Sequence, residues 1–362
     1  MKKRERVERT LACEPVDRVA ICDKLQNDAA IEYYAGQRVR IGDGFATVCR
    51  AIDRVLDLIV NPLRIPRRKR RWTDPEGRER VTHRWAEWIV SHGSDDTAGL
   101  ARLAEADAER WSDWRPNPKY AIEYREEFLR PFEHMDAADP PVRAYSGLPT
   151  LDRAHDLCGH KQFWFLIAEL PDLVEAWLDA LTDAAVAHAH AIGPLGLSPV
   201  AQQSEAIAQG DRTTYSPGML RRLLFPRLKR IVDAWHEHGV KVQFHSNGYL
   251  MDVLDDIAGC GFDGLHPVDR LPGMSLEDVR KHMGPKAHLA GGIDAGRLLA
   301  QGSVADVRKT CERAIASASP GYFLGSSKEL HAGVPLRNAR AMYETPGRLA
   351  GLPVPTPWGV RG

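Results

Sequence analysis

The C-terminal half of the chain alternates short apolar runs with amphipathic stretches. After Ser216 and Pro217, apolar residues recur at helical spacing as far as Trp235, which predicts a helix with one buried face. Pro226 inside this stretch predicts a kink. Short apolar runs, polar turns and helical stretches then repeat, a pattern typical of strand–helix units around a parallel sheet. The strands expected in this half are residues 240–244, 262–265, 287–290 and 321–324.

The N-terminal half carries a weaker version of the same pattern. Residues 67–89 predict a two-stranded ribbon that turns at Asp74-Pro75-Glu76-Gly77, because this composition favours a tight turn. Residues 100–140 are charged and rich in Trp and Pro, which indicates an insertion that carries helices. A long helix is expected at residues 173–192, and the stretch 346–362 is expected to be irregular. Further strands are expected at residues 19–22, 57–60 and 199–203, and at a segment that ends at residues 145–147.

These elements together favour a closed barrel over an open nucleotide-binding sheet. No G-x-G-x-x-G or G-x-x-x-x-G-K-[ST] loop follows any of the expected strands. The sequence therefore predicts an α/β fold of the (β/α)₈ TIM-barrel type. One domain is expected to span residues 1–362, with a β-ribbon and helical insertion at about residues 64–140.

Composition narrows the classes of partner. The chain has 362 residues with 49 Lys and Arg against 49 Asp and Glu, so it lacks the basic surplus that nucleic-acid or anionic-membrane binding requires. No apolar stretch approaches the roughly 20 residues of a membrane span. The six cysteines form no C-x-x-C pair, and the charged N-terminus does not resemble a secretory signal. We therefore expect a cytoplasmic protein with free thiols.

Five polar side chains follow expected strands of the barrel. Because catalytic groups of such barrels lie at the C-terminal ends of the strands, these side chains are the first candidates for chemistry. Imidazoles and carboxylates are suited to binding zinc or to moving protons. The two carboxylates, Glu205 and Asp294, are equally suited to capping the next helix. His266 is equally suited to being a hydrogen-bonded residue in the barrel wall. The five candidates are Glu205, His245, His266, Asp294 and His331.

A second group of candidates lies at the ends of the first and third strands. Asp23, Lys24 and Asn27 follow the first strand, where they are suited to binding a substrate or to forming a surface salt bridge. Tyr145 near the end of the third strand offers a phenolic hydroxyl. Together with His266, these residues are the predicted substrate-binding set.

Four ordered segments carry a family resemblance over nearly the whole chain. They resemble motifs of the uroporphyrinogen decarboxylase superfamily, which implies a (β/α)₈ barrel whose active site lies in the loops at the C-terminal ends of the strands. The resemblance does not fix the reaction. The segments are Arg4-Glu5-Arg6 with Asp17-Arg18-Val19, Phe225-Pro226 with His245-Ser246-Asn247-Gly248, Gly291-Gly292-Ile293-Asp294, and Val334-Pro335 with Asn338 and Ala341-Met342-Tyr343.

The chain departs from both main branches of that superfamily. The decarboxylase branch carries an arginine-rich loop after the first strand, where this chain has Asp23 and Lys24. It also carries a His in the last loop, where this chain has Lys328. The corrinoid methyltransferase branch binds zinc through His-x-Cys and a later Cys. This chain keeps His245 but has Asn247 at the first Cys position, with Ser326 and Ser327 near the second.

Our sequence-based hypothesis is a corrinoid-linked methyltransferase that demethylates a small O- or N-methylated substrate. His245, Glu205 and Asp294 are the predicted catalytic residues. Glu205 and His245, with His331, are the predicted ligands if zinc is bound. A separate corrinoid protein would dock over the barrel mouth, and the oligomeric state stays open, with a homodimer among the alternatives.

Two alternatives from other classes stay open at this point. One is a cofactor-free decarboxylase or lyase, in which Asp23 or Asp294 protonates a carbanion and Lys24 binds the substrate carboxylate. The other is a non-catalytic barrel that binds a ligand.

Overall fold

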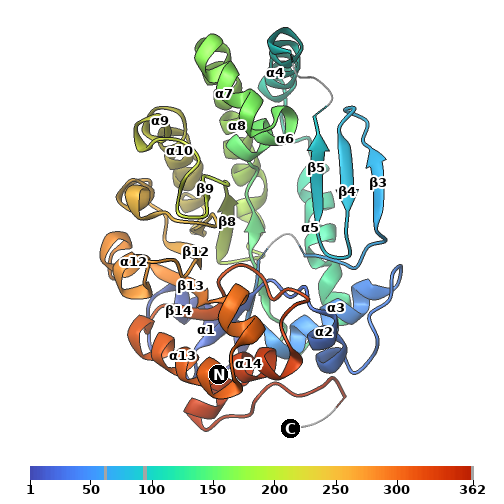
Figure 1. Cartoon of the computed structure of the whole chain (residues 1–362), viewed down its shortest axis with the longest axis vertical. Helices are drawn as coiled ribbons and strands as arrows, with labels where there is room; N and C mark the ends of the chain where they lie inside the picture. The colour runs from blue at the N-terminus through green and yellow to red at the C-terminus, as the bar shows by residue number, and fades with distance from the viewer. Residues whose placement is uncertain (61–62, 93–95, 360–362) are drawn as a thin grey trace.

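The parallel strands of this chain close into a ring. The structure, a computed structural model, describes residues 1–60, 63–92 and 96–359. Its main sheet has the order β6-β2-β1-β14-β13-β12-β11-β8-β7, and all the pairings are parallel (Figure 1). The strands are β1 (Ala20–Asp23), β2 (Leu58–Ile59), β6 (Val142–Arg143), β7 (Tyr145–Ser146), β8 (Val200–Ser204), β11 (Lys241–His245), β12 (Gly264–Val268), β13 (His288–Ile293) and β14 (Tyr322–Ser326).

The two end strands of this sheet are halves of one strand. Only Ala144 separates β6 from β7, and its amide donates to the carbonyl of Ile59 at 2.9 Å. With β6 and β7 counted as one, the nine strands among the described residues make a closed eight-stranded ring. The predicted (β/α)₈ barrel is therefore confirmed.

Helices cover the outside of the barrel and bury their apolar faces against it. Trp177 of α8 and Trp235 of α10 are fully buried in this way. Leu224 separates α9 from α10 two residues before Pro226, where the sequence predicts a kink. No helix in the described part of the chain is both long and apolar enough to cross a bilayer. The helices around the barrel are α2 (Asp28–Ala35), α3 (Gly44–Val55), α6 (Leu151–Cys158), α7 (His160–Glu169), α8 (Pro171–Ile192), α9 (Pro217–Leu223), α10 (Phe225–His236), α11 (Leu254–Gly259), α12 (Leu276–Met283), α13 (Val304–Ala318) and α14 (Leu336–Ala350), with short turns at η2 (Gly193–Leu195), η3 (Met251–Val253) and η4 (Ala295–Leu299).

The first helix closes the bottom of the barrel, where the strands begin. Val7 and Leu11 of α1 (Lys3–Leu11) share one apolar cluster with Ala20, Val200 and Phe323, which come from three different strands. The strands finish at the opposite end, which is the end that carries the active site in enzymes of this fold. We call that end the barrel mouth.

The predicted ribbon has three strands instead of two. β3 (Arg70–Thr73), β4 (Glu79–Thr82) and β5 (Glu87–Ser91) form an antiparallel sheet beside the barrel (Figure 1). The first turn is the predicted one, and Asp74 there accepts from the amides of Glu76 and Arg78 at 3.1 and 2.9 Å. The second turn closes through the amide of His83 and the carbonyl of Ala86 at 2.7 Å and contains no Gly, Pro, Asn or Asp, so it was missed.

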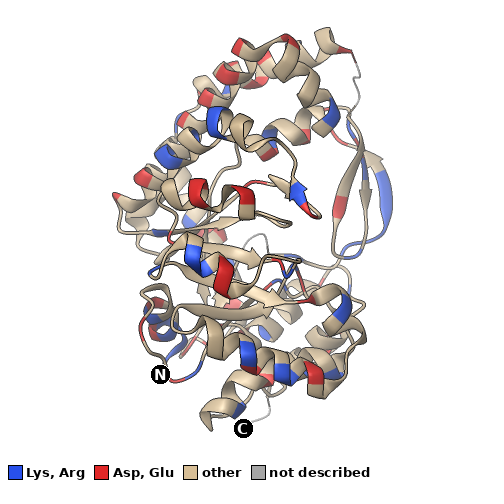
Figure 2. Cartoon of the chain, turned by 60° about the vertical axis from the view of Figure 1, so that its left-hand side comes forward, with Lys and Arg blue, Asp and Glu red and all other residues tan. Residues whose placement is uncertain are grey.

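The edge of this three-stranded sheet is basic. Figure 2 shows Lys and Arg gathered along it, and β3 exposes Arg70 and Arg71. Charged side chains on an edge strand discourage pairing with another chain.

The predicted insertion contains two helices and a short turn. These are α4 (Thr97–Ser112), α5 (Tyr120–Leu129) and η1 (Arg130–His134). Residues 93–95 of the predicted insertion lie outside the described residues.

The chain end is more regular than its composition suggests. Residues 346–350, expected to be irregular, complete α14, with Pro346 inside the helix and Gly351 ending it in the left-handed conformation. Met342 and Tyr343 are fully buried, so packing against the barrel outweighs the cost of the proline. A short hairpin, β9 (Ala208–Gln209) with β10 (Arg212–Thr213), was not predicted. The last residues of the predicted irregular tail, 360–362, lie outside the described residues.

Candidate active site

Strand alternation decides which polar residues enter the barrel. Gln243 of β11 donates to Gln202 of β8 at 3.3 Å and bonds His288 of β13 at 3.3 Å, so these three side chains meet inside. Successive side chains of a strand point to opposite faces. His245, two residues after Gln243, therefore also points inward, and it lies in register with His266 of β12.

Three basic side chains form a hydrogen-bonded chain at the barrel mouth. Lys24, which follows β1, places its Nζ 3.1 Å from Nε2 of His245. Nδ1 of His245 lies 2.8 Å from Nδ1 of His266. The lysine can only donate, so Nε2 of His245 accepts, and its Nδ1 carries the proton that is donated to His266. We call this arrangement the Lys24–His245–His266 chain.

Burial sets the charge of this chain of residues. Burial lowers the pKa of Lys24 to about 8, and Arg64 acts in the same direction, while Glu329 opposes it. Burial and the nearby ammonium of Lys24 hold the pKa values of both His245 and His266 well below the usual range. At neutral pH the positive charge therefore resides on Lys24, and both imidazoles are neutral.

Glu205 lies outside this cluster. It follows the outward-facing positions Ala201 and Gln203 on β8, and it is completely buried. Its carboxylate accepts from the amide and hydroxyl of Thr150 at 2.8 Å each, from the amide of Asp152 at 2.9 Å and from Gln203 at 3.1 Å. The side chain thus holds the first turn of α6, and only its backbone amide bonds His245, through the carbonyl at 3.0 Å.

Asp294 and His331 are also occupied elsewhere. Asp294 caps η4 and accepts from the amides of Gly296 and Arg297 at 2.9 and 3.1 Å. His331 bonds the carbonyl of Ala295 through Nε2 at 3.1 Å, and its Nδ1 accepts from the amide of Gly333 at 3.0 Å. Within the described part of the chain, no hydrogen bond joins either side chain to His245.

Asp23 points away from the mouth. It accepts from the hydroxyls of Ser326 at 2.6 Å and Tyr343 at 2.9 Å, which tie β1 to β14 and α14. Burial raises its pKa to about 6, and these two donors oppose the shift. Its neighbour Lys24 faces the barrel interior, as the alternation of side chains requires.

Asn27 and Tyr145 hold neighbouring segments. Asn27 caps α2 through the amide of Ala30, and its amide group donates to the carbonyls of His331 and Val334 at 2.8 and 2.9 Å. Tyr145 accepts from the amide of Leu197 at 2.8 Å, a residue that precedes β8, and its ring stacks on Trp235 at 5.3 Å. Of the predicted substrate-binding residues, the structure brings only Lys24 and His266 to His245.

Sequence reasoning missed Arg64. This half-buried guanidinium lies in the loop after β2, and Arg64 and Lys24 line one crevice. Burial lowers the pKa of Arg64, and the nearby Arg67 acts in the same direction. Its position just after a strand was the available signal.

The residues at the mouth do not fit a zinc ion. Both nitrogens of His245 are engaged, one of them by a lysine. Ser326 donates its hydroxyl to Asp23, and the hydroxyl of Ser327 accepts from the amide of Ala295 at 3.3 Å. Among residues 1–60, 63–92 and 96–359, no group of three or more His, Cys, Asp or Glu side chains is placed to hold a metal. The predicted set of Glu205, His245 and His331 is therefore not assembled.

Comparison with known families agrees with the barrel and its sequence motifs. The family model described as uroporphyrinogen decarboxylase (URO-D) matches residues 153–348, which include His245 and His266. The chain belongs to this family. The predicted resemblance is thus confirmed.

Curated relatives of this URO-D family member are methyltransferases. A protein of Methanosarcina barkeri named methylcobamide:CoM methyltransferase MtaA is 29% identical over 207 residues, and its counterpart from the strain Fusaro / DSM 804 is 28% identical over 207 residues. Each match covers 56% of this chain and 56% of the relative, so the chain spans about half the length of these relatives.

A solved structure shares the fold. The structure described as a methyltransferase from Methanosarcina mazei aligns with a TM-score of 0.71 over 96% of this chain and 99% of that chain. The two sequences are 19% identical, so this likeness supports the fold alone.

Proposed function

We propose that this URO-D family protein is a corrinoid-linked methyltransferase that removes a methyl group from a small O- or N-methylated substrate. The relatives named methylcobamide:CoM methyltransferase support this class of reaction. The observation that carries the proposal is the Lys24–His245–His266 chain at the barrel mouth. It places one proton donor at the end of the barrel where enzymes of this fold bind their substrates.

The leaving group explains why a proton donor is needed. When the bond between the methyl carbon and the heteroatom breaks, its electron pair stays on the heteroatom. An alkoxide or amide anion is a poor leaving group near neutral pH, so the heteroatom takes a proton from Nζ of Lys24 as the bond breaks. A corrinoid carried by a separate protein would supply the cobalt that accepts the methyl group.

His245 and His266 position that proton. A neutral His245 accepts a hydrogen bond from Lys24 through Nε2 and is itself fixed by His266, so the lysine side chain is held in one place. The lowered pKa of Lys24, about 8, makes it a stronger acid than an ordinary lysine while leaving it mostly protonated at pH 7. Because the residues present do not fit a zinc ion, the proton donor in this proposal is Lys24 alone.

The geometry supports the decarboxylase or lyase alternative less well. The carboxyl oxygens of Asp23 bond Ser326 and Tyr343 on the outer side of the barrel. Asp294 is occupied at the start of η4. Neither carboxyl group is therefore placed to protonate a carbanion beside Lys24.

The proposal is tested by methyl transfer to a reduced corrinoid. Purified protein is incubated with free cob(I)alamin and one methyl donor at a time, which is methanol, 4-methoxybenzoate or trimethylamine. Formation of methylcobalamin is followed by absorbance. We expect one class of methyl donor to be used, with kcat in Lys24→Met lower by about 10²–10⁴-fold. Lys309→Met changes an exposed lysine on α13 and should have wild-type activity.

Other outcomes separate the alternatives. Full activity in Lys24→Met would remove the lysine from the mechanism. Stoichiometric zinc that is lost in His245→Ala would support a metal site and contradict the fit described above. A protein that releases CO₂ from a carboxylic acid and transfers no methyl group would support a decarboxylase. A ligand bound equally well by Lys24→Met and His245→Gln, without turnover, would support a non-catalytic barrel.

A further inference from the structure

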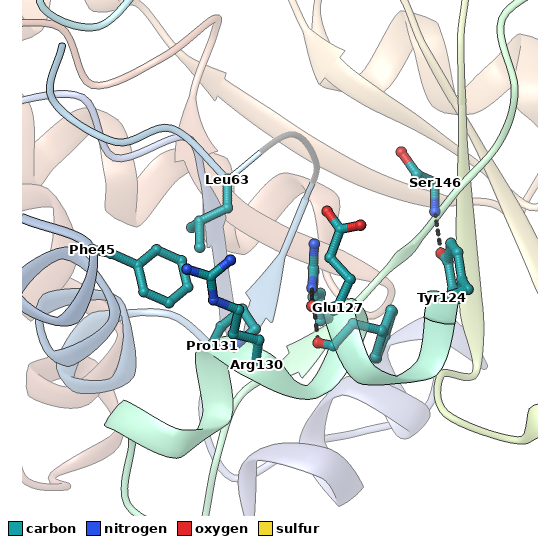
Figure 3. A pocket seen from close by; sticks show the side chains of 9 residues that line it. Phe45, Leu63, Tyr124, Glu127, Arg130, Pro131 and Ser146 are labelled. Atoms are coloured by element: carbon teal, nitrogen blue, oxygen red, sulfur yellow. Dashed lines mark hydrogen bonds between the residues drawn. The ribbon is translucent and has the colours of Figure 1, made fainter. Parts of the chain in front are cut away.

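A pocket of about 290 Å³ opens beside the end of the third barrel strand. It is bounded by the start of α3, by α5 with η1, and by Ser146 at the end of β7 (Figure 3). Leu63 lines this pocket and also lines the crevice that contains Lys24. The pocket is therefore a neighbour of the proposed active site.

Two guanidinium groups face this pocket, each against an aromatic ring. Arg130 lies over the ring of Phe45 and Arg143 over the ring of Phe128, both at 5.0 Å from the ring centre. Figure 3 shows Arg130 beside Phe45 on one side of the pocket, with Tyr124 and Ser146 on the other. Such contacts fix the plane of a guanidinium group.

Arg143 is also fixed by the end of α5. Its Nη1 donates to the carbonyls of Glu127 and Phe128 at 3.1 and 2.8 Å, in the last turn of that helix. The guanidinium is half-buried, and burial lowers its pKa. A cation held in a partly desolvated place favours an anionic ligand beside it.

The charges of the lining leave a positive balance. Among the described residues that line the pocket, Arg130 and Arg143 are cationic, and Glu127, which is exposed, carries a carboxylate. No salt bridge joins Arg130 to an Asp or Glu among the residues that the structure describes. The remaining walls are mostly apolar, with three aromatic rings from Phe45, Tyr124 and Phe128. The volume lies just below the usual range for ligand pockets, which suits a single ring.

We propose that this pocket binds the carboxylate-bearing ring of a small aromatic acid. Arg130 binds the carboxylate, Arg143 adds positive charge beside it, and the aromatic walls pack against the ring. The role of this acid as the methylated substrate rests on the proposed function. In that role its methylated heteroatom would lie towards Leu63 and the crevice that contains Lys24. Binding of the acid itself does not rest on it, and is measured without turnover.

Calorimetric titration with benzoate and with benzamide tests this proposal. The two probes have nearly the same shape and differ in charge. We expect benzoate to bind the wild-type protein at least tenfold more tightly than benzamide, and Arg130→Gln to weaken benzoate by about tenfold, the usual worth of one charge-assisted hydrogen bond. Glu127→Gln removes the opposing charge and should tighten benzoate. Arg212→Gln, on the exposed β9–β10 hairpin, is the matched control and should bind like wild type.

The results that overturn this inference differ from those that overturn the proposed function. Equal binding of benzoate and benzamide, or unchanged benzoate binding in Arg130→Gln, rules out the pocket as an anion site. Arg130 and Glu127 are exposed, so these variants are expected to fold. Methyl transfer with unaltered benzoate binding in Arg130→Gln would leave the methyltransferase standing and remove only the pocket. Benzoate binding that changes in the variants as expected, without any methyl transfer, would support the pocket and contradict the proposed function.

Discussion

The two ends of the barrel differ in whether their buried charges are paired. At the bottom, Asp57 is completely buried and accepts from Arg6 at 2.8 Å and from Arg18 at 2.8 Å, and Arg6 also pairs with Asp17 at 2.7 Å. At the mouth, Lys24 bonds the imidazole of His245, which in turn bonds His266, and within the described residues no carboxylate lies within salt-bridge distance of Lys24. The charges at the bottom are paired in salt bridges, whereas the ammonium at the mouth has no salt-bridge partner among the described residues.

This difference indicates which end is built for stability and which for chemistry. Paired and hydrogen-bonded charges at the bottom hold α1 against the first strands. Removing one partner therefore leaves the others buried without a counter-charge. A desolvated cation without a salt-bridge partner costs folding free energy, and such a cost is typical of sites that are completed by a ligand. Variants at the two ends should therefore change different measured quantities.

The largest effect is expected at the bottom. Asp57→Ala leaves Arg6, Arg18 and the amide of Ile21 without their shared acceptor. We expect a loss of about 3–5 kcal/mol in the free energy of unfolding, measured by urea titration. Asp211→Ala, which removes an exposed pair with Arg212, should change little. If both variants are equally stable, the bottom network contributes no more than a surface pair.

An intermediate effect is expected at Glu205, which tests whether this residue belongs to the mouth. Glu205→Ala removes the acceptor for Thr150, Asp152 and Gln203, so we expect a loss of about 1–3 kcal/mol in the free energy of unfolding. Activity per folded molecule should stay within a few-fold of wild type, with the exposed Glu312→Ala as control. A 100-fold loss of activity without a loss of stability would instead assign Glu205 to catalysis.

The smallest effect on stability, and one of opposite sign, is expected at the mouth. The folded protein holds the pKa of Lys24 at about 8 against an ordinary 10.5. Between these pH values the unfolded chain binds the proton that the folded chain has released, so the stability of the wild type rises with pH there. Below pH 8 it bears the full cost of the buried ammonium.

Lys24→Met removes that cost. At pH 7 this variant should be at least as stable as the wild type in urea titration, and its advantage should shrink as the pH rises from 8 towards 10.5. A variant that is less stable than the wild type at pH 7 would mean that Lys24 braces the barrel and that the contrast between the two ends is wrong.

The strands were predictable because buried strands are short, apolar and separated by turn residues. The segment expected at 240–244 is β11 (Lys241–His245), and that expected at 199–203 is β8 (Val200–Ser204). The third strand of the ribbon was missed because the turn from His83 to Ala86 contains no turn-forming residue. The end of α14 was missed because burial of Tyr343 outweighs the local effect of Pro346.

The candidate site was predictable only in part. His245, His266 and Lys24 were selected because they follow strands, and the structure joins them. Glu205 met the same criterion, yet it lies on the outer face of the barrel. Inward and outward positions differ by a single residue along a strand, and a strand end predicted to within one or two residues does not resolve them.

The sequence by itself determined the class of fold, the order of its elements and the family, since these follow from hydrophobic spacing, turn residues and motifs along the chain. Only the tertiary structure decided which strand-end residues meet, because closure of the ring brings Lys24 of the first strand beside His245 of the fifth. Only the tertiary structure set their charges as well, since burial lowers the pKa values of Lys24, His245 and His266, and burial is a property of the packed barrel.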